Sequence, residues 1–220
     1  TEIYISNYTE NQSKMKTLSN YITESIQDRI HVCFDTEFTG LTKDADIISI
    51  GLVAENGNTF YAEFTDFDVS KCSGWVLDNI VAKLEYYNRE DNLSKSFLKR
   101  DFKNYVVVGN KDKVQVELIL WFEQLKASSF FMVADCSSWD WVLFNDLMAD
   151  YSSGTPVLPC SISYIPIDVC TMMVEKDLDP DLDRLEYLGL SLEEKDAMHN
   201  SLHDAMICQK VYNKLKGINK

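Results

Sequence analysis

Alternation of apolar and polar residues predicts three strands in the first third of the chain. A period of two indicates a strand over about 30–36, a second over 46–54 and a third over 59–64. The last two flank the tetrapeptide Glu-Asn-Gly-Asn, and Asn-Gly is a strong signal for a tight hairpin turn. Three consecutive strands with short links are typical of an antiparallel meander.

Helical spacing and apolar runs predict alternating helices and strands in the rest of the chain. The helical segments are 10–29, 75–87, 113–126, 138–151, 168–175, 181–188 and 200–216. Apolar runs predict strands at 105–108, 130–134 and 162–167, and we expect 130–134 to be buried and central. The charged, mixed residues 88–104 predict a surface loop. Together these elements predict an α/β domain with a mixed sheet.

The sequence also predicts where helices end and which face of one helix is buried. Asp112 is placed to help cap the third predicted helix, and Ser137 or Ser138 to cap the helix after the central strand. Gly189 and Gly217 are expected to end the last two helices. The core-facing residues of the third helix are expected to be Val116, Leu118, Ile119, Phe122 and Leu125.

The length and composition predict one folded domain. The chain has 220 residues, of which 45% are hydrophobic and 12% aromatic, which is enough to bury a substantial core. We expect a single domain over residues 30–216, preceded by a helical N-terminal extension, residues 1–29, that packs on the core. A contact between subunits is the alternative use of this extension.

Hydropathy and cysteine usage predict an intracellular, cytoplasmic protein. No run of about 18 apolar residues occurs, so we expect no membrane span, and the chain does not open on a basic-then-apolar signal peptide. The six cysteines form no Cys-x-x-Cys pair, and several lie in apolar runs. This pattern favours reduced core thiols over a disulfide framework or a zinc site.

The net charge of −14 restricts the partners that the surface can bind. This charge argues against binding nucleic acid through a broad basic surface. A metal-dependent nucleic-acid enzyme is not excluded, because bound cations offset carboxylates locally. Such an enzyme would hold its substrate mainly at one end.

Two acids at the end of the first predicted strand are the first candidate for chemistry. Asp35 and Glu37 are two residues apart, so on a strand their side chains point to the same face. Two adjacent carboxylates repel each other, and a divalent cation such as Mg²⁺ or Mn²⁺ removes that conflict. The alternative is an ordinary strand end with solvated acids.

Further acids and a histidine are predicted to approach the same end of the sheet. Asp140 lies in the first turn of the helix after the central strand, and Asp204 lies near the start of the last helix. His199 precedes that helix and can reach over a site that the helix lines. Separately, each has an ordinary alternative: an acid that favours a helix dipole, or a surface histidine. Together they suit phosphodiester hydrolysis with two metal ions and a neutral histidine as general base.

Three segments resemble the motifs of the DEDDh-type 3′–5′ exonucleases, the DnaQ-like family. Asp-Thr-Glu-Phe-Thr-Gly-Leu at 35–41 with Ile-Gly-Leu-Val at 50–53 is similar to the first motif. Ser-Trp-Asp-Trp at 138–141 is similar to the second, and His-Asn-Ser-Leu-His-Asp-Ala at 199–205 to the third, in its His-x-x-x-x-Asp form. Asn200 stands where the tyrosine branch of the family would have tyrosine.

The resemblance implies a fold, a set of ligands and a base. The fold is ribonuclease H-like, and the cofactors are two divalent metal ions, Mg²⁺ or Mn²⁺. Asp35, Glu37, Asp140 and Asp204 would be the metal ligands, and His199 the general base.

The resemblance also bears on substrate contacts. In this family the residues corresponding to Phe38, Thr39 and Leu41 hold the terminal nucleotide, and Phe38 or Trp139 could stack on a base; core packing is the alternative for both aromatic residues. His203 is the rival for the base, but its side chain points about 100° away from that of the neighbouring aspartate.

The resemblance implies an exonuclease that releases mononucleotides from the 3′ ends of single-stranded RNA or DNA. Trp-Val at 75–76 and the histidine-rich third motif resemble most a small bacterial and phage exoribonuclease group described from mycobacteria, so RNA is the first choice. Single-stranded DNA, a catalytically silent end-binding module, and a structural metal-binding domain are the alternatives. A homodimer is compatible with the family, although no apolar stripe identifies an interface.

Overall fold

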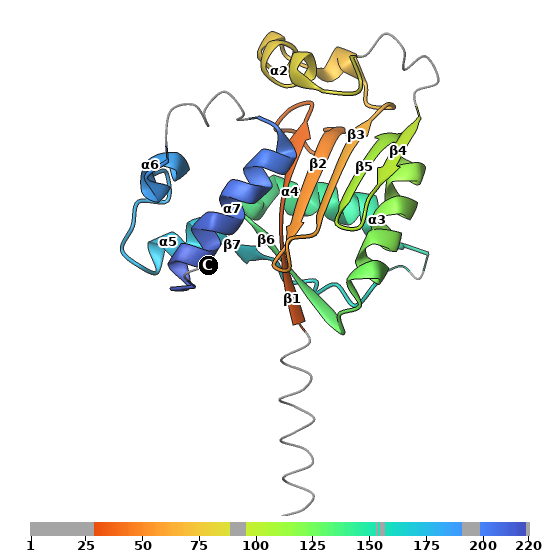
Figure 1. Ribbon diagram of the computed structural model, residues 1–220. Helices are drawn as coiled ribbons and strands as arrows, with labels where there is room; N and C mark the ends of the chain where they lie inside the picture. The colour runs from red at the N-terminus through yellow and green to blue at the C-terminus, as the bar shows by residue number, and fades with distance from the viewer. Residues whose placement is uncertain (1–28, 89–95, 153, 155–156, 191–198, 219–220) are drawn as a thin grey trace, which may run out of the picture.

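A mixed seven-stranded sheet forms the centre of the molecule (Figure 1). The computed structural model describes residues 29–88, 96–152, 154, 157–190 and 199–218, so the helix predicted over 10–29 lies, apart from its last residue, outside the described part. The strands are β1 (Arg29–Phe38), β2 (Ile47–Ala54), β3 (Thr59–Phe64), β4 (Phe97–Arg100), β5 (Asn104–Gly109), β6 (Ser129–Ala134) and β7 (Ile167–Asp168). Their order in the sheet is β4-β5-β3-β2-β1-β6-β7.

The pairing confirms the predicted meander, whereas the strand predicted to be buried and central is largely buried but lies second from one edge of the sheet. Strands β1, β2 and β3 are antiparallel neighbours, and β6 lies parallel to β1, between β1 and the edge strand β7. Strand β5 is parallel to β3 and antiparallel to β4, while β7 is parallel to β6. In the register of β1 with β2, Asp35 pairs with Gly51 and Glu37 with Ser49. This combination of parallel and antiparallel pairs makes the sheet mixed, as predicted.

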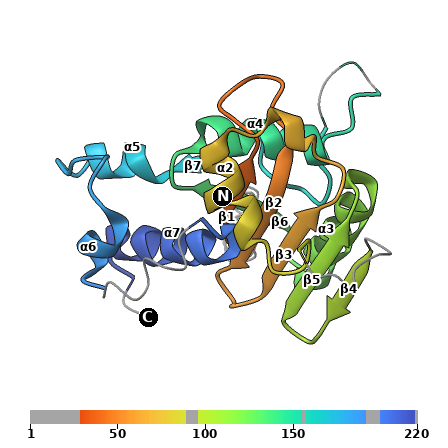
Figure 2. The same ribbon diagram turned by 90° about the horizontal axis from the view of Figure 1, so that it is seen from above.

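Helices cover both faces of the sheet. They are α2 (Gly74–Asn79), α3 (Lys111–Leu125), α4 (Ser137–Met148), α5 (Val169–Val174), α6 (Arg184–Leu188) and α7 (Ser201–Leu215), with short 3-10 helices η1 (Val69–Lys71) and η2 (Val81–Lys83). Viewed from above, α3 and α4 lie on one side of the sheet and α7 on the other (Figure 2). None of the helices in the described ranges is long and apolar enough to span a lipid bilayer.

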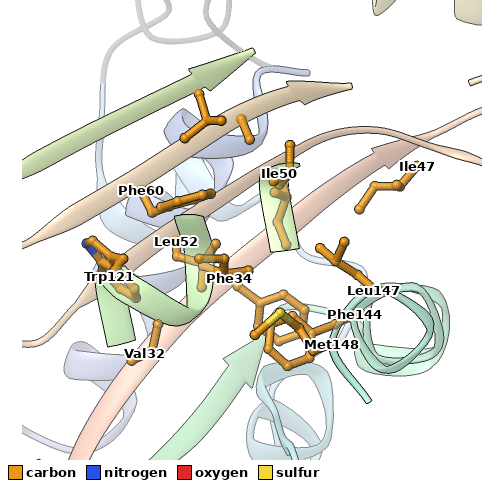
Figure 3. Close-up of a cluster of buried hydrophobic side chains, with 14 of the residues drawn as sticks. Val32, Phe34, Ile47, Ile50, Leu52, Phe60, Trp121, Phe144, Leu147 and Met148 are labelled. Atoms are coloured by element: carbon orange, nitrogen blue, oxygen red, sulfur yellow. The ribbon is translucent and has the colours of Figure 1, made fainter. Parts of the chain in front are cut away.

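The alternation of β1 divides the core between the two faces. Val32 and Phe34 point toward α3 and α4, where Phe34 packs beside Phe144 of α4 (Figure 3). Cys33 points the other way, into a second cluster with α5, α6 and α7. Because residues i and i+2 share a face, Asp35 must lie on the same side as α7.

The predicted helix over 75–87 is wrong in extent. Helix α2 ends at Asn79 and the chain continues into η2. Glu63 of β3, which is fully buried, explains why no helix extends to residue 87. Its carboxylate accepts hydrogen bonds from the backbone N–H groups of three consecutive residues, Glu85, Tyr86 and Tyr87. These N–H groups are therefore not available to continue a helix.

Two edge strands also differ from the prediction. Part of the predicted loop 88–104 forms β4, which pairs with β5 at the edge of the sheet. Within the predicted strand 162–167, regular pairing is confined to its last residue, in β7, and Ile162 makes an isolated bridge. Pro166 has no N–H to donate to a neighbouring strand, which explains the interruption.

The predicted caps of α3 and α4 are wrong. Cys136, rather than a serine, occupies the N-cap of α4, and the side chain of Asp168 accepts the N–H of Ser137 at 2.8 Å. The N-cap of α3 is Asn110, and Asp112 lies in the first turn. The predicted core face of α3 also differs, because Val116 is exposed.

On α3, Leu118, Phe122 and Leu125 are buried as predicted, but Val116 is 54% exposed. Val114 and Trp121 are buried in addition. The predicted ends of α6 and α7 fit better, because Gly189 adopts the left-handed conformation directly after α6 and Gly217 follows the C-cap of α7.

Candidate active site

A cavity of about 620 Å³ opens at the carboxyl end of β1. Three elements contribute the chemistry-bearing side chains: the end of β1, the first turn of α4 and the start of α7. All five residues predicted to carry the chemistry line this cavity, namely Asp35, Glu37, Asp140, His199 and Asp204. Segments that are distant in the sequence therefore meet at one end of the sheet.

A glycine allows α7 to approach the sheet closely. A Cβ atom at Gly51 would lie 2.3 Å from the Cα of Leu202, so only glycine fits beneath the first turn of α7. Beside it, the hydroxyls of Ser49 and Ser201 are hydrogen-bonded at 3.0 Å. This close contact brings Asp204, in the first turn of α7, to the face of β1 that carries the two strand acids.

Asp140 is oriented by Thr36, which lies between the two strand acids and points to the opposite face. Both the backbone N–H and the hydroxyl of Thr36 donate to Oδ1 of Asp140, at 2.9 and 2.5 Å. Thr36 is 4% exposed and Asp140 8% exposed, so these bonds are shielded from water. One carboxylate oxygen of Asp140 is thus occupied and the orientation of the other is fixed.

Glu37, His199 and Asp204 form a compact group. One possible ligand atom from each lies within 4.8 Å of those of the other two. The backbone N–H of His199 donates to Oδ2 of Asp204 at 2.9 Å, and His199 adopts a left-handed conformation with φ of 66°. His203 lies in the first turn of α7 and does not line the cavity.

Burial and mutual repulsion raise the pKa values of the four carboxylates. Burial is the largest cause for each, and Asp140, Glu37 and Asp204 further raise the pKa of Asp35 well above its usual range. The pKa of Glu37 is raised to about 8, and those of Asp140 and Asp204 to about 6. A divalent cation among these oxygens would relieve the repulsion, so the residues fit a hard metal ion such as Mg²⁺ or Mn²⁺.

Two residues lie near His199 that the sequence did not place at the site. The Trp75 ring of α2 makes an edge-to-face contact with the imidazole, with centroids 5.1 Å apart and ring planes at 85°. Burial, and then the positive charge of Lys83, lower the pKa of His199, which favours the neutral imidazole. Both residues come from the amphipathic segment after residue 74, and only the fold brings them near His199.

Of the four residues predicted to contact the nucleotide, three line the cavity and one does not. Phe38, Leu41 and Trp139 line the cavity, and Leu41 is 68% exposed. Thr39 does not line it: the residue is 2% exposed, and its hydroxyl accepts the N–H of Asp46 at 2.9 Å. Thr39 therefore closes the base of the loop that carries Leu41.

An ion pair stabilises the far wall of the cavity. Nε of Arg184 donates to Asp135 at 2.8 Å, and another nitrogen of the same guanidinium contacts Sγ of Cys170 at 3.0 Å. The guanidinium also donates to the backbone carbonyl oxygen of Pro180 at 2.8 Å. Asp135 is thus a further carboxylate in the cavity, but its charge is balanced by Arg184.

Comparisons with known proteins agree with this geometry. The sequence model of the 3′-5′ exoribonuclease Rv2179c-like domain matches residues 30–215. Two curated relatives from Mycobacterium tuberculosis, the 3′-5′ exoribonuclease Rv2179c of strain H37Rv and the 3′-5′ exoribonuclease MT2234.1 of strain CDC 1551, are each 29% identical over 106 residues. That alignment covers 48% of this chain and spans 59% of the length of each relative.

A solved structure shows the same fold at low sequence identity. Pop2p of S. pombe, in a form described as bound to Mg²⁺ and Mn²⁺, superposes with a TM-score of 0.56 and 13% identity. The superposition covers 93% of this chain and 90% of Pop2p, which confirms the ribonuclease H-like α/β fold. With the family match over most of its length, the chain belongs to the family of 3′-5′ exoribonuclease Rv2179c-like domains.

Proposed function

We propose that this protein is a metal-dependent 3′–5′ exonuclease that releases nucleoside monophosphates, with RNA as its preferred substrate. One observation carries the proposal: four carboxylates from three elements and a half-buried imidazole line a single cavity. The names of the matched family and of its curated relatives support this activity and the choice of RNA.

Asp35, Glu37, Asp140 and Asp204 would hold two divalent ions, Mg²⁺ or Mn²⁺, in this proposal. The donors are carboxylate oxygens, which hard cations prefer, and the pKa values raised by burial and crowding indicate that positive charge is needed there. When bound, such ions would lower the pKa of the attacking water and stabilise charge on the leaving 3′ oxygen.

His199 acts as the general base in this reaction. Its lowered pKa keeps the imidazole neutral near pH 7, so it can accept the proton of the attacking water. The water oxygen bonds to the phosphorus atom, the bond from phosphorus to the 3′ oxygen breaks, and a nucleoside monophosphate leaves. Phe38, Leu41 and Trp139, which line the same cavity, would hold the terminal nucleotide.

The charge distribution supports binding of an end rather than of a long track. The net charge is −14, and the cavity is itself rich in carboxylates. Contacts that depend on bound cations are therefore confined to the substrate end that enters the cavity.

A time course on labelled single strands tests the proposal. RNA and DNA of equal sequence, labelled at the 5′ end, are incubated with Mn²⁺, with EDTA, or with the Asp35→Ala protein. We expect a ladder that shortens from the 3′ end, faster on RNA, and that disappears with EDTA and in the variant. Faster cleavage of DNA would favour the exodeoxyribonuclease. Binding without cleavage under every metal condition would favour an end-binding module.

A further inference from the structure

Trp75 contacts the imidazole of His199 from an element far away in the sequence. The two ring centroids are 5.1 Å apart and the ring planes are nearly perpendicular, at 85°. Aromatic rings attract one another in this edge-to-face arrangement. In Figure 1, α2 lies above the carboxyl end of β1, on the same side as the start of α7.

The backbone that carries Trp75 is firmly fixed. The hydroxyl of Ser73 caps α2 by accepting the N–H of Val76 at 3.2 Å, and the side chain of Asn79 donates to the carbonyl of Trp75 at 2.9 Å. Val76 and Ile80 are 7% and 5% exposed, so this segment is packed on the core. The contact with His199 therefore starts from a rigid support.

The indole itself is not needed to fill the core. Trp75 is 54% exposed, although large aromatic side chains gain most from burial. The buried contacts of the segment are made by Val76 and Ile80 instead. A half-exposed indole against the side chain of His199, a residue that lines the cavity, calls for another explanation.

His199 needs a side-chain contact to hold its orientation. Its backbone is anchored by the bond from its N–H to Asp204, but that bond leaves the two side-chain torsions free. A general base must keep one ring nitrogen within hydrogen-bond reach of its proton donor. Among the described residues, Trp75 is the aromatic ring that contacts this imidazole.

We propose that Trp75 is a positioning residue: its ring holds the imidazole of His199 toward the gap between Glu37 and Asp204. The inference rests on the proposed exonuclease function. In that reaction Trp75 acts through His199 rather than by touching the substrate. Its substitution should therefore change kcat and not substrate binding.

Steady-state kinetics of Trp75→Leu on a short RNA strand test this role. We expect kcat to fall about 10–100-fold while KM stays nearly constant, because a misoriented base slows the chemical step. Tyr164→Leu removes an aromatic ring that is 79% exposed and does not line the cavity, and it should keep wild-type kinetics. A large rise in KM at constant kcat would overturn the proposal in favour of a direct contact with the substrate.

A double-mutant cycle separates the two roles further. In the His199→Ala protein, the added Trp75→Leu change should cause no further loss of kcat, since the group that Trp75 orients is already missing. An additional loss equal to that seen in the wild-type background would contradict the proposal.

A magnetic-resonance measurement tests the contact without relying on activity. In ¹H–¹³C spectra of the histidine rings, Trp75→Leu should shift the His199 resonances and leave those of His31 in place. Unchanged His199 resonances would overturn the inference. If the wild-type protein cleaved no RNA or DNA but the shift appeared, the proposed function would fail while the positioning contact would stand.

Discussion

At the scale of single residues, Thr36 explains why a polar residue stands between two acids on a strand. Its side chain points away from Asp35 and Glu37, and its two donors bind the same oxygen of Asp140. A carboxylate held by two donors has a fixed direction for its second oxygen. The sequence could predict Asp140 as part of the site, but not this partner, since Thr36 resembles any other strand threonine.

Removing the hydroxyl of Thr36 should therefore weaken the site more than the fold. We expect Thr36→Val to lower kcat or Mn²⁺ affinity about 10-fold, because groups that orient a metal ligand have effects of this size. The free energy of unfolding should fall by only about 1 kcal/mol. Calorimetric titration with Mn²⁺ and kinetics provide the measurements, and Thr36→Ser is the matched control that keeps the hydroxyl.

His199 and His203 offer a second comparison between single residues. His199→Ala should reduce kcat about 10²–10⁴-fold, the usual contribution of a general base, while Mn²⁺ binding persists. His203→Ala should retain most activity, because His203 does not line the cavity. If activity survived the first change and not the second, the assignment of the base would be wrong.

At the scale of elements, the contact between α7 and β2 determines whether the acids meet. The periodicity of β1, β2 and α7 was sufficient to predict these elements, and their motifs placed the acids on them. The sequence pattern could not reveal that Gly51 is the point at which the helix rests on the strand, since a glycine in a strand has several uses.

A methyl group at Gly51 should separate the two elements. In Gly51→Ala the new Cβ would collide with the backbone of Leu202, so α7 must shift and carry Asp204 away from Glu37. We expect the free energy of unfolding to fall by about 1–3 kcal/mol, the range for an overfilled contact, together with a loss of activity.

Gly74→Ala provides the control for that change. No atom lies within 4 Å of a Cβ at Gly74, so its stability measured by urea unfolding should remain close to wild type. Equal stability and activity for Gly51→Ala would show that α7 does not depend on this contact.

Other elements could not be derived because distant residues override the local pattern. The last residues of the amphipathic segment after residue 74 are held out of a helix by Glu63, which lies on strand β3. Likewise, β4 has little alternation of its own and is recruited by its neighbour β5. At the start of α4, the N–H of Ser137 is bound by the side chain of Asp168, which lies 31 residues later in the sequence.

At the scale of the whole molecule, the acidic cavity links stability to pH. In the folded, metal-free protein the pKa of Glu37 is raised from 4.5 to about 8, and those of Asp140 and Asp204 from 3.8 to about 6. The folded state then binds protons more tightly than the unfolded chain. These groups favour folding below about pH 4, and their contribution declines as the pH rises to about 8.

Thermal unfolding with EDTA should show this decline. We expect Tm to fall by about 5 °C or more between pH 5 and pH 8, and Mn²⁺ to raise Tm most at pH 8, where the carboxylates are ionised. Asp35→Asn removes one of the charges and should flatten the decline. A Tm in EDTA that stayed constant or rose over this range would contradict the raised pKa values.

The fold class and the acids of the site could be predicted from the sequence, whereas the residues around His199 could not. Antiparallel strands followed by alternating elements predicted the mixed sheet, and motif spacing predicted which acids gather at its end. Trp75 contributed to the family resemblance, but neither it nor Lys83 carried a predicted role, and only the three-dimensional arrangement brings them to His199.

The carboxylate of Glu63 has a consequence for the exchange of amide hydrogens with solvent. Residues 85–87 lie outside helices and strands, where small local openings normally let amide hydrogens exchange quickly. Here their N–H groups bind a fully buried carboxylate on a strand inside the sheet, so they become available only when that part of the sheet opens. In hydrogen–deuterium exchange, these three amides should be protected like those of β3, and Glu63→Gln should release them. This irregular segment would then be as slow to open as the strand that holds it.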